Sequence, residues 1–176
     1  MALLIAGCSA ERVETPTFDS TSTPVSPPSA PVKYPAEVLR SCQDIRQRVG
    51  ADLPASEPDD DSPAGAQPAA KTCLFKAAEQ TITFAIKSWR STDATGVVSG
   101  NDHAKSYFTD RTAGWDEEGA GIGSIARWRE ARDSACAMEA LDENAVLTVA
   151  QTGVGGEQCR TSVRALAKKF YSAVQP

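Results

Sequence analysis

This chain lacks the residues that most metal sites and catalytic centres need. His103 is the only histidine among 176 residues, and the five cysteines, at positions 8, 42, 73, 136 and 159, form no C-x-x-C pair. A structural zinc site draws on clustered Cys and His, so we expect no metal. No run of about 18 apolar residues occurs, so we expect no helix that spans a bilayer.

Basic residues are also few. Lys and Arg number 18 against 23 Asp and Glu, which leaves a net charge of −5. Proteins that bind nucleic acid concentrate positive charge to match the phosphate backbone, so we expect no nucleic-acid partner. The acidity favours solubility instead.

Motifs of catalysis and nucleotide binding are missing as well. Residues 119–123 read G-x-G-x-G, which is not the spacing of a dinucleotide fingerprint, and no P-loop lysine follows. Neither G-x-S-x-G nor S-x-x-K occurs. Ser99, Asp102 and His103 lie close in sequence, but we interpret them as loop residues. We therefore expect no enzyme, no catalytic residue and no cofactor.

Three charged clusters are interpreted as solvated surface. The aspartates at 59–61 are consecutive, whereas calcium loops alternate their ligands. Residues 116–118 form an acidic run, and a carboxylate pair for glycoside hydrolysis would depend on a separation that the sequence does not reveal. Arg160, Arg164 and Lys168 recur every four residues along a predicted helix, with contact to anionic lipid head groups as the alternative.

The chain opens with a short apolar stretch that ends at a cysteine. Residues 5–8, Ile-Ala-Gly-Cys, resemble a bacterial lipobox, in which a small residue precedes the cysteine that receives the lipid. A secretory signal has a basic start and about 7–15 apolar residues, but only six residues separate Met1 from Cys8. We interpret residues 1–8 as the remnant of a signal whose natural start lies upstream, with Cys8 as the lipid attachment site. An ordinary apolar N-terminus is the alternative.

Residues 9–35 follow as a segment rich in Pro, Ser and Thr. They hold six of the eleven prolines and nine Ser and Thr residues. Such a composition cannot bury enough apolar surface to order itself, so we expect a disordered tether. A lipobox followed at once by a tether predicts a protein anchored through Cys8 at the outer face of the cell membrane.

Residues 36–176 are expected to form one globular extracytoplasmic domain. Apolar residues at steps of three and four predict a helix over 36–49, with Cys42 on its apolar face. Residues 51–70 carry five acids and no base, so we expect a disordered loop there.

Alternating apolar residues predict strands. The clearest strand spans 81–89, with Ile82, Phe84 and Ile86 on one side. Further strands are expected at 72–75 and 123–132, a hairpin at 135–141 and 145–152, and a helix at 157–173. The rest of 90–134 shows no clear pattern. The elements predict an α+β fold, in which a small antiparallel sheet packs with an N-terminal and a C-terminal helix.

Four cysteines in the body of the chain allow three disulfide pairings. We favour Cys42–Cys73 and Cys136–Cys159, because each pair joins a predicted helix to the nearest strand in sequence. Pairing of this kind is expected in an oxidising compartment.

The whole pattern resembles a family of small actinobacterial surface lipoproteins, of the mycobacterial type, whose function is unknown. The resemblance rests on the lipobox, the tether, and the runs 41–45, 73–75, 136–141, 146–150 and 159–167. It implies an extracytoplasmic α/β domain with two disulfides, and it brings no catalytic residues with it.

Two functions follow as hypotheses. The first is a tethered binding or interaction module, whose partner is an envelope protein or ligand. The second is a carrier of a lipid or small apolar ligand, which would need an internal pocket lined by Ile82, Phe84, Ile86 and Leu147. A filled core favours the interaction module.

Overall fold

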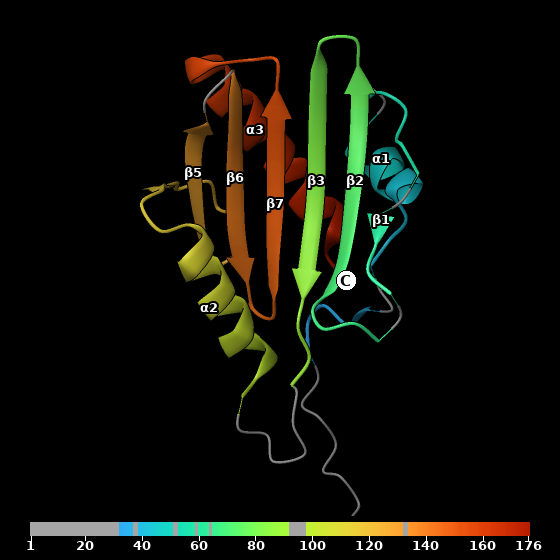
Figure 1. Ribbon diagram of the computed structural model, residues 1–176, viewed down its shortest axis with the longest axis vertical. Helices are drawn as coiled ribbons and strands as arrows, with labels where there is room; N and C mark the ends of the chain where they lie inside the picture. The colour runs from blue at the N-terminus through green and yellow to red at the C-terminus, as the bar shows by residue number, and fades with distance from the viewer. Residues whose placement is uncertain are drawn as a thin grey trace, which may run out of the picture.

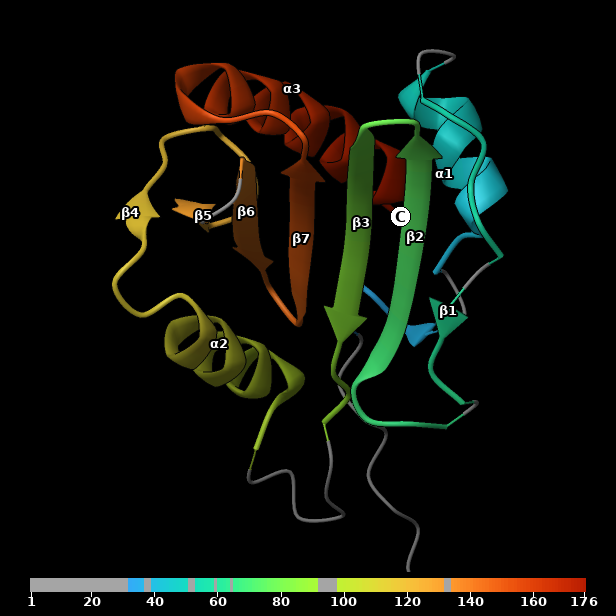
Figure 2. The ribbon, with the colours of Figure 1, turned by 45° about the horizontal axis from the view of Figure 1, so that its top comes forward.

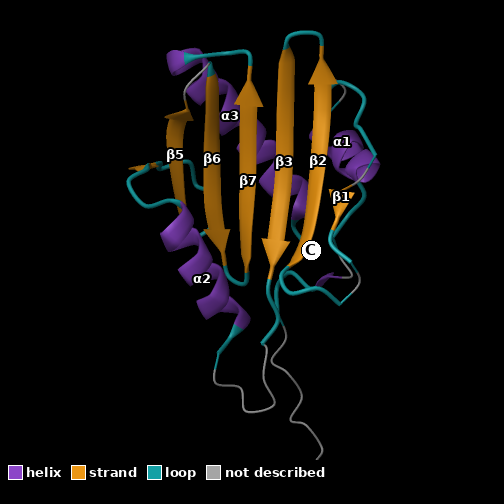
Figure 3. Ribbon diagram, in the orientation of Figure 1, coloured by secondary structure: helices purple, strands orange, loops and turns teal. Residues whose placement is uncertain are grey.

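The computed structural model describes residues 32–36, 39–50, 53–58, 60–63, 65–91, 98–131 and 134–176. Cys8 and residues 9–31 of the predicted tether lie outside the described residues. The domain is α+β, as predicted (Figures 1 and 3). In the described residues the helices are α1 (Cys42–Val49), α2 (Gly100–Arg111) and α3 (Gly156–Val174). The strands there are β1 (Asp60–Asp61), β2 (Ala69–Ala77), β3 (Gln80–Ser88), β4 (Asp116–Glu117), β5 (Ile125–Ala131), β6 (Ala135–Asp142) and β7 (Ala145–Thr152).

The strands form one antiparallel sheet in the order β1-β2-β3-β7-β6-β5-β4. Two hairpins, β2–β3 and β6–β7, make its centre, and β3 pairs with β7 to join them. The short strands β1 and β4 cover parts of the two edges, which limits exposure of unpaired backbone groups.

The predicted alternation in β3 is confirmed. Ile82, Phe84 and Ile86 are buried, whereas the residues between them are half-exposed. They face α3, where Phe84 stacks on Phe170 with ring centroids 4.5 Å apart. A strand whose side chains alternate in this way can bury one face and leave the other to solvent.

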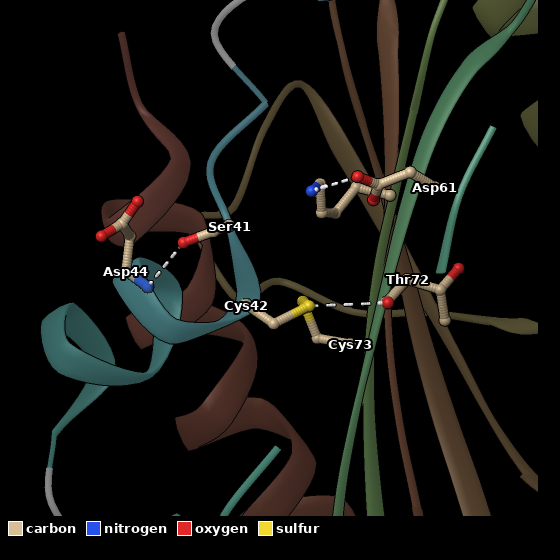
Figure 4. The surroundings of a disulfide bond; sticks show 7 residues. Ser41, Cys42, Asp44, Asp61, Thr72 and Cys73 are labelled. Atoms are coloured by element: carbon tan, nitrogen blue, oxygen red, sulfur yellow. Dashed lines mark hydrogen bonds and ion pairs between the residues drawn. A yellow bond between two sulfur atoms is a disulfide. The ribbon is translucent and has the colours of Figure 1, made fainter. Parts of the chain in front are cut away.

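The terminal helices confirm the prediction with one change of boundary. α3 closely matches the predicted 157–173, but α1 begins at Cys42 and not at residue 36. Ser41 is the reason, because its hydroxyl accepts a hydrogen bond from the Asp44 amide and caps the helix there (Figure 4).

Both predicted disulfides are present. Cys42–Cys73 links α1 to β2, with Cα atoms 5.4 Å apart, and Cys136–Cys159 links α3 to β6, with Cα atoms 6.1 Å apart. Figure 4 shows the first bridge spanning from the start of α1 to the sheet. Each helix on the packed side of the sheet therefore has a covalent link to a strand.

Helix α2 was not predicted. Its sequence shows little of the apolar periodicity of an amphipathic helix, because only two of its apolar side chains, those of Ala104 and Phe108, are buried. It also starts at Gly100, where a Cβ atom would lie 2.4 Å from the Trp89 carbonyl oxygen. A glycine at this position argues against a helix in the sequence. The structure nevertheless requires it, because α2 starts so close to the end of β3 that a Cβ atom would not fit.

The predictions for residues 51–70 and for the end of the tether are wrong in part. Leu53 is buried, and the pair Asp60–Asp61 forms β1 against β2, so this acidic segment is not wholly a disordered loop. Tyr34, which we placed in the tether, is 1% exposed and belongs to the core. A hydrophilic or Pro-rich composition did not reveal these contacts, because they form with distant parts of the chain.

Candidate functional site: the open face of the sheet

The helices cover the two faces of the sheet unequally. α1 and α3 lie on one face, and α2 lies on the other, where it packs on Trp89, Leu141 and Val146 at one end of β5, β6 and β7 (Figure 2). No helix within the described residues covers the rest of that second face. We call this uncovered area the open face.

Small and β-branched side chains make up the open face. Cross-strand registers place Thr72, Ala85 and Thr148 in one row and Thr83, Ala150 and Ala137 in the next. All six side chains are half-exposed, as is Leu74 beside Thr83. Four neighbouring strands therefore present a surface of short side chains that end in methyl and hydroxyl groups.

One carboxylate lies buried at the margin of the open face. Glu139 on β6 is 0% exposed, and its Oε1 accepts hydrogen bonds from Arg111 of α2 and from the Thr148 hydroxyl, the latter at 3.3 Å. Its Oε2 has no partner among the described residues. The hydrogen bond that Arg111 donates to Glu139 raises the pKa of Arg111, and the ion pair links α2 to the sheet.

Three cations at the same margin lie over aromatic rings. The Lys87 ammonium lies 4.8 Å from the centre of the Tyr107 ring and donates to its hydroxyl at 2.9 Å. The Arg127 guanidinium lies over Phe108, and that of Arg129 over Trp115, at 5.4 and 4.6 Å. None of the three cations has an ion-pair partner within the described ranges.

Two of the three cations of the basic stripe of α3 are engaged inside the domain, whereas Lys168 is exposed. Arg160 and Arg164 both donate to Glu118, at 3.1 and 2.6 Å, and Arg160 also covers the Trp128 ring. Glu118 is buried, so the part of our interpretation that placed residues 116–118 in solvent is wrong for this residue. Burial would raise the pKa of Glu118, but the hydrogen bonds from the two arginines outweigh it and lower that pKa.

The other sequence candidates have structural roles. The Ser99 hydroxyl accepts from the Asp102 amide at 3.1 Å and caps α2. Gly123 has a φ of +61°, and a Cβ there would lie 2.3 Å from the Leu141 carbonyl oxygen, so the glycine run turns the chain into β5. Asp61 pairs with Lys71 at 2.7 Å (Figure 4). Asp59 lies outside the described residues.

Sequence reasoning missed a polar cluster that holds the first described residues. Asn144 accepts from the Tyr34 amide and donates to the Tyr34 carbonyl, both at 3.0 Å, and donates to the Trp89 carbonyl at 2.9 Å. Asp142 accepts from the Tyr34 hydroxyl and from Lys33, the latter at 2.6 Å. In the sequence, the one sign of this cluster was Tyr34, an aromatic residue at the end of the Pro-rich segment.

Burial and hydrogen bonding act against each other at Asp142. Burial raises the pKa of this carboxyl, whereas the hydrogen bonds from Lys33 and Tyr34 lower it, and the net pKa is lowered. The same cluster raises the pKa of Tyr34, because burial and the neighbouring carboxylate both disfavour the phenolate.

The four residues proposed to line a carrier cavity lie in a packed core. Ile82, Phe84, Ile86 and Leu147 are each 7% exposed or less. The structure does present a pocket of about 270 Å³, but it opens to solvent between residues near α1 and the β1–β2 edge. Its walls include Leu39, Asp61 and Arg90, and none of the four core residues lines it.

Comparisons with known proteins add no family. No protein family, curated protein or solved structure matches the chain. Among the described residues, no helix is long and apolar enough to cross a membrane. In that same part of the chain, no three His, Cys, Asp or Glu side chains gather as metal ligands would.

Proposed function

We propose that this protein is a lipid-anchored module of the cell envelope that binds a partner through the open face of its sheet. The observation that carries the proposal is the unequal covering of the sheet. One face is sealed by α1, α3 and two disulfides, while Thr83, Ala85 and Ala150 stay half-exposed at the centre of the other. Elements of a domain bury a sheet face by packing against it, and we infer that a partner packs on the part of the sheet that no helix of the described residues covers.

The anchor is the other half of the proposal. The lipobox-like run ending at Cys8 and the Pro/Ser/Thr-rich segment after it support attachment to the outer face of the membrane. Residues 9–31 would separate the lipid from Val32, the first described residue. A tether of about 23 residues reaches roughly 70 Å when extended as polyproline II, enough to present the domain to other envelope components.

A lipid carrier is the weaker alternative. The residues that would line its cavity are packed instead against α3, and the stacked pair Phe84–Phe170 occupies the space between sheet and helix. The pocket at the β1–β2 edge has mixed polar and apolar walls and opens to solvent. An apolar ligand gains little from such a site, because much of its surface would remain in water.

Site-specific photo-crosslinking in the native host tests the proposal. A photoreactive residue at Thr83 or Ala150 should form an adduct of defined mass. The same residue at Lys169 or Ser172, which are exposed on α3, should not. If neither open-face position gives an adduct, or if all four positions give the same adducts, the open face is not the binding surface.

A further inference from the structure

Four cations lie along the margin of the open face, on β3, α2 and β5. Arg127 and Arg129 are two residues apart on the same side of β5, and Arg127 lies directly opposite Glu139 in the register with β6. Arg111 donates to Glu139, and one turn earlier on α2 the Tyr107 hydroxyl accepts from Lys87 of β3. We call Lys87, Arg111, Arg127 and Arg129 the cationic band.

The band carries uncompensated positive charge although the whole chain carries −5. Glu139 neutralises Arg111, which leaves Lys87, Arg127 and Arg129 without a carboxylate within ion-pair distance among the described residues. Glu117, opposite Arg127 in the register of β4 with β5, is exposed and forms no ion pair there. Aromatic rings hold Lys87 and Arg129 in place, and Arg127 is held by the Phe108 ring and by hydrogen bonds that it donates to the Thr112 carbonyl and hydroxyl, so less side-chain entropy remains to be lost on binding.

We propose that the cationic band binds an extended acidic segment of a partner protein, with its backbone laid over the Thr and Ala rows of the open face. The band crosses from β3 to β5, which is three interstrand steps of about 4.8 Å, or roughly 14 Å. An extended peptide covers that distance in about four to five residues, so two or three acidic side chains reach the band together. This proposal rests on the open face being the binding surface, and it names the chemistry of the partner.

The shape of the surroundings favours a peptide over a bilayer. α2 lies on the same face of the sheet as the band, and its solvent-exposed residues include Asp102 and Asp110 as well as Lys105. A planar anionic membrane would meet this helix before it reached the sheet. A narrow chain lies beside the helix and contacts the band directly.

Nuclear magnetic resonance titration of the unacylated full chain tests the proposal. The probe is a ten-residue peptide of alternating Glu and Ala, and the matched control peptide has Gln in place of Glu. We expect the Glu peptide to shift the amide signals of Lys87, Arg127, Arg129 and Thr148. The affinity should fall by about tenfold or more between 50 and 200 mM salt, because exposed charges are screened.

Variants assign the effect to the band. Lys87→Gln and Arg129→Gln should each weaken binding by about three- to tenfold. Lys168→Gln and Lys169→Gln, which remove exposed cations from α3, should leave it unchanged. Unperturbed spectra elsewhere in the chain show that each variant is folded.

Three outcomes overturn the proposal. They are equal binding of the Gln peptide, no shift at up to 1 mM Glu peptide (about −4 kcal/mol), and binding of phosphatidylglycerol vesicles through the band without binding of the peptide. If any of these results occurs but Thr83 or Ala150 still forms crosslinks, the open face remains the binding surface. Only the proposal of an acidic partner segment is then overturned. Failure of both experiments would remove both proposals.

Discussion

The side chain of Asn144 holds the main chain of Tyr34 by two hydrogen bonds, across 110 residues of sequence. The amide donates and accepts as a neighbouring strand would, and it also binds the Trp89 carbonyl at the end of β3. This buried residue, in the turn between β6 and β7, therefore fixes Tyr34 against the sheet together with Asp142, which binds the Tyr34 hydroxyl and Lys33.

Loss of this amide should be costly. Asn144→Ala should lower the free energy of unfolding by about 2–4 kcal/mol, because it leaves a buried amide and two carbonyls without partners. Chemical denaturation measures the change. Asn101→Ala, an exposed asparagine on α2, serves as the control and should change stability by less than about 0.5 kcal/mol. A small effect of Asn144→Ala would mean that residues 33–34 are not firmly held.

Stability should fall in acid through Asp142. The pKa of this carboxyl is lowered in the folded state, so its contribution is fully present above the unfolded pKa of about 3.9 and is lost as the pH falls through the lower, folded pKa. Asp142→Asn should reduce stability at pH 7 and make the acid limb of the stability curve shallower. Asp110→Asn, at an exposed position, should leave that limb unchanged. An unchanged limb in Asp142→Asn would contradict the assignment.

The two disulfides should contribute similar amounts. They close loops with sequence separations of 31 and 23, for which loop-closure entropy gives about 3–4 kcal/mol each. Replacing Cys42 and Cys73 together, or Cys136 and Cys159 together, with Ala should lower the midpoint of urea unfolding to a comparable degree. Peptide mapping without reduction should recover these two pairs, and a Cys42–Cys136 or Cys42–Cys159 link would contradict the fold.

One buried polar group should be replaceable with a gain in stability. Gln151 on β7 is 3% exposed, and its Oε1 has no hydrogen-bond partner in the described part of the chain. It lies between Ile82 and Cys136 in the register of the sheet. Gln151→Met roughly keeps the side-chain volume and removes the unsatisfied oxygen. We therefore expect the free energy of unfolding, measured by thermal unfolding, to rise by about 1 kcal/mol. A loss would indicate that Gln151 has a partner in solution.

Membrane attachment should depend on Cys8. Expressed with a complete upstream signal, the wild-type chain should partition into the detergent phase, because buried acyl CH₂ groups drive membrane binding. Cys8→Ala should stay in the aqueous phase or remain uncleaved. If wild type and variant both partition into the aqueous phase, the anchor half of the proposed function fails, whereas the crosslinking test of the open face is unaffected.

The local pattern of the sequence determined most of the secondary structure and the disulfide framework. Alternation in 81–89 and apolar steps of three and four in 157–173 are visible in the chain itself, because a strand and an amphipathic helix each repeat their buried positions at a fixed period. Cys42 and Cys159 lie on the apolar sides of helices next to strands that carry the other two cysteines, so sequence order was enough to pair them.

Tertiary structure alone decided which face of the sheet is open and which charges are free. Arg111 meets Glu139 across 28 residues, and Glu118 takes up Arg160 and Arg164 across more than 40. Each contact joins side chains whose own segments give no sign of the other. The sequence therefore marked Arg160 and Arg164 as a free basic stripe, whereas packing pairs them with Glu118. Lys87, Arg127 and Arg129 have no ion-pair partner among the described residues, because ion pairing depends on distance in space and not on spacing along the chain.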